Sequence, residues 1–106
     1  MYIIVNNDLG MQKGKIASQV GHVVALWVEQ MLTSNKALYF KWKSTGQKKI
    51  VLKTSQTELE QLMKHSDAKF IIDAGRTQIP EHSLTVVGFL PCYTSADSRF
   101  EKYKLL

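Results

Sequence analysis

The sequence has little of what builds disulfide-rich, metal-rich or membrane-spanning proteins. Cys92 is its single cysteine. A single cysteine excludes an internal disulfide and favours a cytoplasmic location. Cys92 alone also cannot form a cysteine-based metal site. The longest apolar run, Val23–Val28, is far too short to cross a bilayer. The N-terminal residues have neither a basic segment before them nor a cleavage site after them, so they predict a first strand rather than a signal peptide.

Acidic residues are scarce in the first half of the chain. Residues 1–53 contain eight lysines and two acids, Asp8 and Glu29, whereas residues 54–106 contain six basic and seven acidic residues. The net charge is +5 and the isoelectric point is near 9.4. A basic half in so small a protein indicates a polyanionic partner, with RNA as the first candidate. The alternative is a surface that is merely soluble, and charge alone does not decide between them.

The 106 residues have the length of one domain, 1–106. Helical and strand patterns alternate along the chain, which predicts a three-layer α/β/α sandwich with a four-stranded mixed sheet. The last two strands are joined too closely for a helical crossover, so they are either antiparallel neighbours or separated by another strand. The predicted strands are Tyr2–Asn6, Lys48–Lys53, Lys69–Ile72 and Leu84–Leu90. The predicted helices are residues 12–33, residues 36–44, a short helix capped by Ser55, and a last short helix from Ser95 through Arg99 and Phe100.

Two faces of the first helix differ in character. One is an apolar stripe with spacings of three and four, formed by Ile16, Val20, Val23, Trp27 and Met31. The other carries Lys15, Gln19 and His22 at i, i+4 and i+7, near the carboxyl ends of the strands, where open α/β sheets bind ligands. A lone histidine beside valines is more often structural. For the three residues together, a functional and a structural role are equally compatible with the pattern.

A second polar cluster follows the third strand. Asp73, Arg76, Thr77 and Gln78 lie between the apolar run Phe70–Ile72 and Pro80, where a regular strand cannot continue. Loops at the ends of apolar strands commonly carry the chemistry of α/β proteins. The alternative is an ordinary turn, capped by Asp73 and braced by Arg76.

Aromatic and basic residues are interleaved in residues 36–44. Such a pattern suits a nucleic-acid backbone with stacked bases, although aromatics more often fill a core, and we expect Trp42 to do so.

Taken together, these segments resemble the type 2 peptidyl-tRNA hydrolase family of archaea and eukaryotes over nearly the whole chain. The two most specific segments are Lys13–His22 and Asp73–Ile79. The other matching residues are Asn7-Asp8-Leu9, Met11, Trp42, Gly46-Gln47, Lys49, Thr85-Val86, Gly88, Pro91 and Lys104-Leu105. The sequence departs from the family at Asn6 and Gly10, where basic residues are usual, at Val20-Gly21, and in a short segment around residues 65–69.

The resemblance implies a hydrolase that cleaves the ester between a peptide and the 3′ ribose of tRNA. It further implies a homodimer with no metal or organic cofactor, acting on peptidyl-tRNA away from membranes. The implied active site combines Lys15, Gln19 and His22 with Asp73, Arg76, Thr77 and Gln78. We expect the basic half to bind tRNA phosphates, through Lys13, Lys15, Lys41, Lys43, Lys48 and Lys49.

The mechanistic hypothesis is direct attack of water on the ester. Asp73 and His22 are the expected acid/base pair, Lys15 would neutralise the oxyanion or a nearby phosphate, and Thr77 would position the water or substrate. Gln19 or Gln78 would donate a further hydrogen bond, and Arg76 would brace the loop or bind phosphate. No Gly-x-Ser-x-Gly motif supports a serine nucleophile. Two alternatives remain: a non-catalytic RNA- or protein-binding adaptor on the same fold, and a related hydrolase of another acyl ester or amide.

Overall fold

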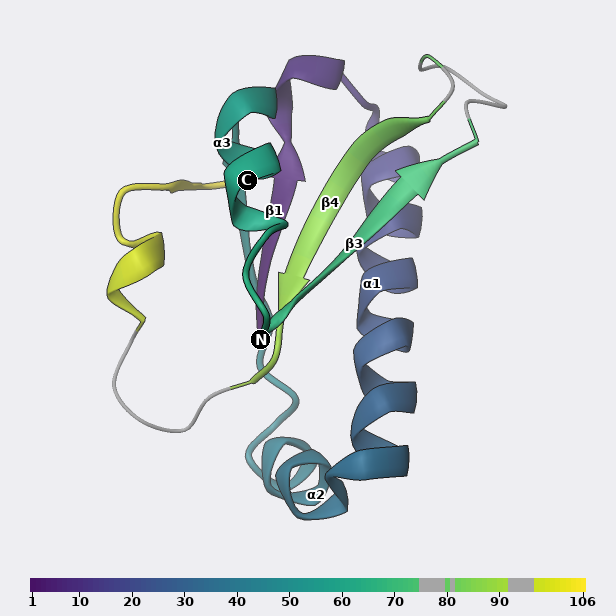
Figure 1. The fold of residues 1–106 in the computed structure, drawn as a ribbon, viewed down its shortest axis with the longest axis vertical. Helices are drawn as coiled ribbons and strands as arrows, with labels where there is room; N and C mark the ends of the chain where they lie inside the picture. The colour runs from purple at the N-terminus through teal and green to yellow at the C-terminus, as the bar shows by residue number, and fades with distance from the viewer. Residues whose placement is uncertain (75–79, 81, 92–96) are drawn as a thin grey trace.

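The computed structural model describes residues 1–74, 80, 82–91 and 97–106, and its fold is built on one mixed β-sheet (Figure 1). The strand order is β3-β4-β1-β2-β5. β1 and β2 are parallel, β4 is antiparallel to both β1 and β3, and β5 is antiparallel to β2. The strands are Tyr2–Asn6 (β1), Ile50–Thr54 (β2), Ala68–Asp73 (β3), Ser83–Phe89 (β4) and Lys104–Leu105 (β5).

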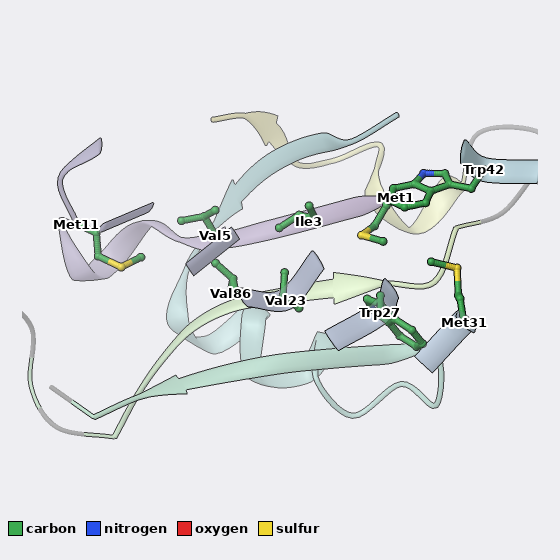
Figure 2. Close-up of a cluster of buried hydrophobic side chains, with 9 residues drawn as sticks. All are labelled: Met1, Ile3, Val5, Met11, Val23, Trp27, Met31, Trp42 and Val86. Carbon is green, nitrogen blue, oxygen red and sulfur yellow. The ribbon is translucent and has the colours of Figure 1, made fainter. Parts of the chain in front are cut away.

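Helices cover both faces of the sheet, which confirms the predicted three layers. Because successive side chains of a strand point to opposite faces, Ile3 and Ile4 belong to different hydrophobic clusters. Ile3 packs in the cluster that contains Val23 and Trp27 of α1 (Figure 2), whereas Ile4 packs in the cluster of Leu59 of α3. The helices are Lys13–Ser34 (α1), Lys36–Ser44 (α2) and Gln56–Leu62 (α3), with 3-10 helices Asn7–Leu9 (η1) and Ser98–Phe100 (η2).

The sheet has five strands rather than the predicted four. The additional strand is β5, in which Lys104 and Leu105 pair with Lys53 and Leu52 of β2. A two-residue strand is too short to show an alternating pattern in the sequence, and it forms because the edge of β2 offers unpaired backbone groups. The prediction of a mixed sheet is confirmed, and the last two strands of the four predicted, β3 and β4, are antiparallel neighbours.

The bounds of the helices and strands differ from the predicted bounds by a few residues. β2 begins at Ile50 rather than Lys48, and the last predicted helix is reduced to η2, whose cap is the side chain of Asp97. The predicted cap Ser95 lies outside the described residues. Ser55 does cap α3, because its side chain accepts a hydrogen bond from the backbone N–H of Glu58.

The buried line of α1 differs from the predicted stripe in its first half. Val23, Trp27 and Met31 are buried as expected, but Ile16 and Val20 are only partly buried at the margin of the cluster. Gln19, expected on a polar face, is 2% exposed and continues the buried line one turn toward the helix start. Trp42 is in the core, 3% exposed, as predicted.

The strands β1, β2 and β3 run in the same direction, so their carboxyl ends, at Asn6, Thr54 and Asp73, lie at the same end of the sheet. We call this end of the sheet the carboxyl edge, which is distinct from the edge strands. α1 starts at this edge and leads away from it to α2 at the opposite end of the molecule (Figure 1). Within the described part of the chain, no helix is both long and apolar enough to span a membrane.

Candidate active site

An ion pair joins the two polar segments that the sequence singled out. Lys15, in the first turn of α1, places its Nζ 2.8 Å from Oδ1 of Asp73, the last residue of β3. The two side chains are only 12% and 14% exposed. The pair therefore experiences less solvent screening than a surface salt bridge, and loss of either partner would leave a largely buried charge. The expectation that the helix start and the end of the third strand lie side by side is confirmed.

Gln19 lies one helical turn beyond Lys15 and is bound from the sheet side. The hydroxyl of Thr85 in β4 donates a hydrogen bond to Gln19 Oε1 at 2.7 Å and lies 3.2 Å from the backbone oxygen of Ile71. Thr85 is fully buried. The Gln19 amide thus ties α1 to β4 one helical turn from Lys15, which is a positioning role.

His22 lies on the exposed side of α1. Its Nε2 is 3.5 Å from Ser18 Oγ on the preceding turn, a long contact, and Ser18 is its hydrogen-bond partner among the described residues. The structure therefore brings Lys15 to Asp73, whereas it holds His22 beside Ser18.

Two residues that depart from the family pattern, Asn6 and Gly10, stabilise the local structure at the carboxyl edge. Asn6 is 1% exposed, donates to the Gln56 side chain and to the backbone oxygen of Leu84, and accepts from the backbone N–H of Asp8. Gly10 has a φ of +61°, a left-handed conformation that glycine adopts without strain. Asn6 thus joins β1, η1, β4 and α3 behind the site.

The predicted tRNA-binding lysines fall into two groups. Lys13 is exposed at the start of α1, near the carboxyl edge. The second group is exposed at the opposite end of the molecule, on α2 and just before β2 begins: Lys41, Lys43, Lys48 and Lys49. The predicted Arg76, Thr77 and Gln78 lie outside the described residues.

Sequence reasoning gave no role to Thr85 or to Asn6, which the structure places at the base of the site. The signal for Thr85 was present, because it is a polar residue within the apolar run Leu84–Leu90. Asn6 ends the apolar run of β1, and its buried amide satisfies two backbone groups, the Leu84 oxygen and the Asp8 N–H.

Chemically, this edge presents a cation and a carboxylate in contact, on rigid elements, with partial access to solvent. An ammonium can stabilise an oxyanion or a phosphate, and a carboxylate can accept a proton from water. Within the described residues, no group of three metal-ligating side chains is assembled.

Comparison with known proteins gives consistent matches along the chain. A family model described as Peptidyl-tRNA hydrolase PTH2 matches residues 1–106. The chain is 35% identical over 113 aligned positions to "Peptidyl-tRNA hydrolase" of Thermoplasma volcanium, covering 100% of this chain and 97% of the relative. It is 41% identical over 96 positions to "Peptidyl-tRNA hydrolase" of Methanococcus maripaludis, covering 84% and 82%.

The mammalian relatives are longer. The chain is 39% identical over 97 positions to "Peptidyl-tRNA hydrolase 2, mitochondrial" of Bos taurus, an alignment that covers 86% of this chain and 54% of the relative. The match therefore spans about half the length of the bovine protein, whereas it spans nearly all of the Thermoplasma one.

Proposed function

Because the chain belongs to the peptidyl-tRNA hydrolase PTH2 family, whose members are hydrolases of ester bonds, we propose that it hydrolyses the ester joining a peptide to the 3′ ribose of tRNA. The observation that carries the proposal is the Lys15–Asp73 ion pair at the carboxyl edge. It unites the two segments that are most specific to the family, and it supplies the two charges that the reaction needs.

In the proposed reaction, the oxygen of a water molecule bonds to the ester carbonyl carbon while Asp73 takes up a proton from that water. The Lys15 ammonium stabilises the negative charge that develops on the carbonyl oxygen. The bond to the ribose oxygen then breaks, and a proton passes to that oxygen, which leaves a free peptide and a tRNA with a 3′ hydroxyl. Lys15 holds Asp73 in place, and the His22 imidazole lies beside Ser18, so we propose that Asp73 takes the proton itself rather than orienting the imidazole.

His22 is the proposed second proton-transfer group, which delivers the proton to the leaving oxygen. Its side chain is exposed and is held by one long contact with Ser18, so it is accessible to substrate. Thr77 is proposed to position the water, and Gln78 to donate a hydrogen bond to the substrate. Gln19 is buried against Thr85, and its proposed role is to hold α1 on β4. Arg76, Lys13, Lys48 and Lys49 are proposed to contact tRNA phosphates.

We also propose that the protein acts in the cytoplasm as a homodimer. The exposed apolar residues Phe70 and Ile72 on β3, at the edge of the sheet, support a contact with a second copy.

The test of the activity is release of free tRNA from N-blocked aminoacyl-tRNA by the wild type and by Asp73→Asn. We expect the wild type to cleave this substrate but not unblocked aminoacyl-tRNA, and we expect turnover by Asp73→Asn to fall by about 10²-fold or more. Circular dichroism checks that the variant is folded. A folded wild type that binds tRNA without cleaving it would identify an adaptor instead.

The role of His22 needs a separate comparison. If His22 transfers a proton, His22→Ala lowers kcat by about 10²-fold, whereas Ser18→Ala, which removes only its helical neighbour, has little effect. Full turnover by His22→Ala would leave Asp73 as the single proton-transfer group of the pair.

A further inference from the structure

A strongly basic surface lies at the end of the molecule that the proposed active site does not use. We call it the α2 surface, and it consists of exposed residues from α2 and from the loop leading into β2: Lys36, Phe40, Lys41, Lys43, Lys48 and Lys49. Residues 30–57 contain no aspartate or glutamate. Since most protein surfaces intersperse both signs of charge, this surface is unusual in carrying one sign only.

An exposed aromatic ring lies among these charges. Phe40 is 55% exposed, and it shares one face of α2 with Lys36 and Lys43, which are four residues before it and three after it. Tyr39 contacts its ring edge-on at a centroid distance of 5.3 Å. A cationic helix face with a supported, solvent-facing aromatic ring is the arrangement that binds a nucleic-acid backbone and stacks a base.

The loop lysines are held in place against α2. Trp42, buried in the core, donates a hydrogen bond from Nε1 to the backbone oxygen of Lys48 at 3.1 Å. The Lys49 ammonium lies 5.3 Å from the centroid of the Trp42 ring and donates to the backbone oxygen of Gln47. These contacts fix the position of the loop against α2.

The α2 surface is far from the Lys15–Asp73 pair. About 20 residues of α1 separate Lys15 from the start of α2, a length of about 30 Å at 1.5 Å per helical residue. Figure 1 shows α2 at the opposite end of α1 from the helix start. A ligand that reaches both places must be an extended polyanion.

We propose that the α2 surface binds the phosphate backbone of the tRNA body, with Phe40 stacking on an exposed base, while the 3′ ester lies at Lys15 and Asp73. This inference rests on the proposed function. It makes the α2 surface a second, remote contact that selects full-length tRNA over shorter esters and takes no part in the chemistry.

The test compares two substrates, an N-blocked aminoacyl-tRNA and the same N-blocked aminoacyl group on a CCA trinucleotide. Lys36→Gln/Lys43→Gln and Phe40→Ala should raise KM for the full-length substrate by about 10-fold or more without changing kcat, and should leave cleavage of the trinucleotide ester unchanged. The slope of log affinity against log salt should become shallower by about 1 to 2 for the double lysine variant. Lys64→Gln/Lys104→Gln removes the same charge from exposed positions elsewhere and should change neither substrate.

Affinity for uncharged tRNA is measured in parallel, which separates the two proposals. If the wild type cleaves neither ester, the proposed function fails, and reduced tRNA affinity in the α2 variants alone still supports the surface. If affinity and KM for full-length tRNA are the same in Lys36→Gln/Lys43→Gln as in the wild type, the α2 surface is not a tRNA site. An equal loss on both substrates would also overturn the inference.

Discussion

At the scale of single residues, Gly88 in β4 allows α1 to pack closely on the sheet. A Cβ at this position would lie 2.9 Å from Cγ2 of Val23, a stiff and fully buried side chain, and Trp27 Nε1 donates to the Gly88 backbone oxygen. We therefore expect Gly88→Ala to lower the free energy of unfolding by about 1–3 kcal/mol through overpacking. Because α1 carries Lys15, turnover should fall as well. Urea denaturation and the tRNA-release assay measure the two effects.

Gly21 provides the matched control on α1. A Cβ at Gly21 would meet nothing within 4 Å, so Gly21→Ala should raise the free energy of unfolding by about 0.5–1 kcal/mol through helix propensity. If Gly88→Ala and the wild type have the same free energy of unfolding, α1 can shift to accommodate the added methyl group, and the overpacking account is wrong.

At the scale of elements, Arg99 fastens η2 to the residue preceding β3. Its guanidinium binds both oxygens of Asp67, at 3.1 and 2.8 Å, and also binds Asp97. These hydrogen bonds hold the pKa of both carboxyl groups below the ordinary value of 3.8. A lowered pKa in the folded state gives stability that is present above pH 3.8 and is lost as the pH falls through the folded-state pKa.

Arg99→Gln should therefore destabilise the protein by about 1 kcal/mol at pH 7, a modest amount because the pairs are partly exposed. The variant should also show a flatter fall in stability below pH 4 than the wild type, measured by thermal unfolding at several pH values. Lys102→Gln, which removes the more exposed pair with Glu58, should change less. Parallel acid profiles for Arg99→Gln and the wild type would contradict this account.

At the scale of the whole molecule, two exposed phenylalanines allow the proposed homodimer and the proposed tRNA contact to be tested independently. Phe70 is 40% exposed on the edge strand β3, and Phe40 is 55% exposed on α2. We expect Phe70→Lys to shift sedimentation equilibrium toward the monomer, because it places a charge in an apolar contact. Phe40→Lys should leave the mass unchanged. A wild-type monomer at micromolar concentration would rule out the homodimer.

Much of the fold was predictable from local pattern. The α1 helix, the Ser55 cap and the burial of Trp42 depend on spacings and hydrogen bonds within a few residues, which the sequence displays directly. The polar segments around Lys15 and Asp73 were equally visible, since polar groups at the ends of apolar runs are anomalous wherever the chain goes next. β5 was missed because two residues carry no periodicity, and its pairing depends on an edge supplied by residues 51 and 53 positions away.

The sequence by itself determined the layer architecture, the basic first half and the identity of the charged residues, because these follow from periodicity and composition. Only the tertiary structure decided which of them meet. Lys15 and Asp73 are 58 residues apart in sequence, yet their side chains are in contact. The buried Gln19 accepts a hydrogen bond from a hydroxyl of β4. Lys48 and Lys49 lie just before β2, at the opposite end of the strands from the ion pair. These outcomes depend on how α1 is seated on the sheet, and side-chain packing between distant segments fixes that placement.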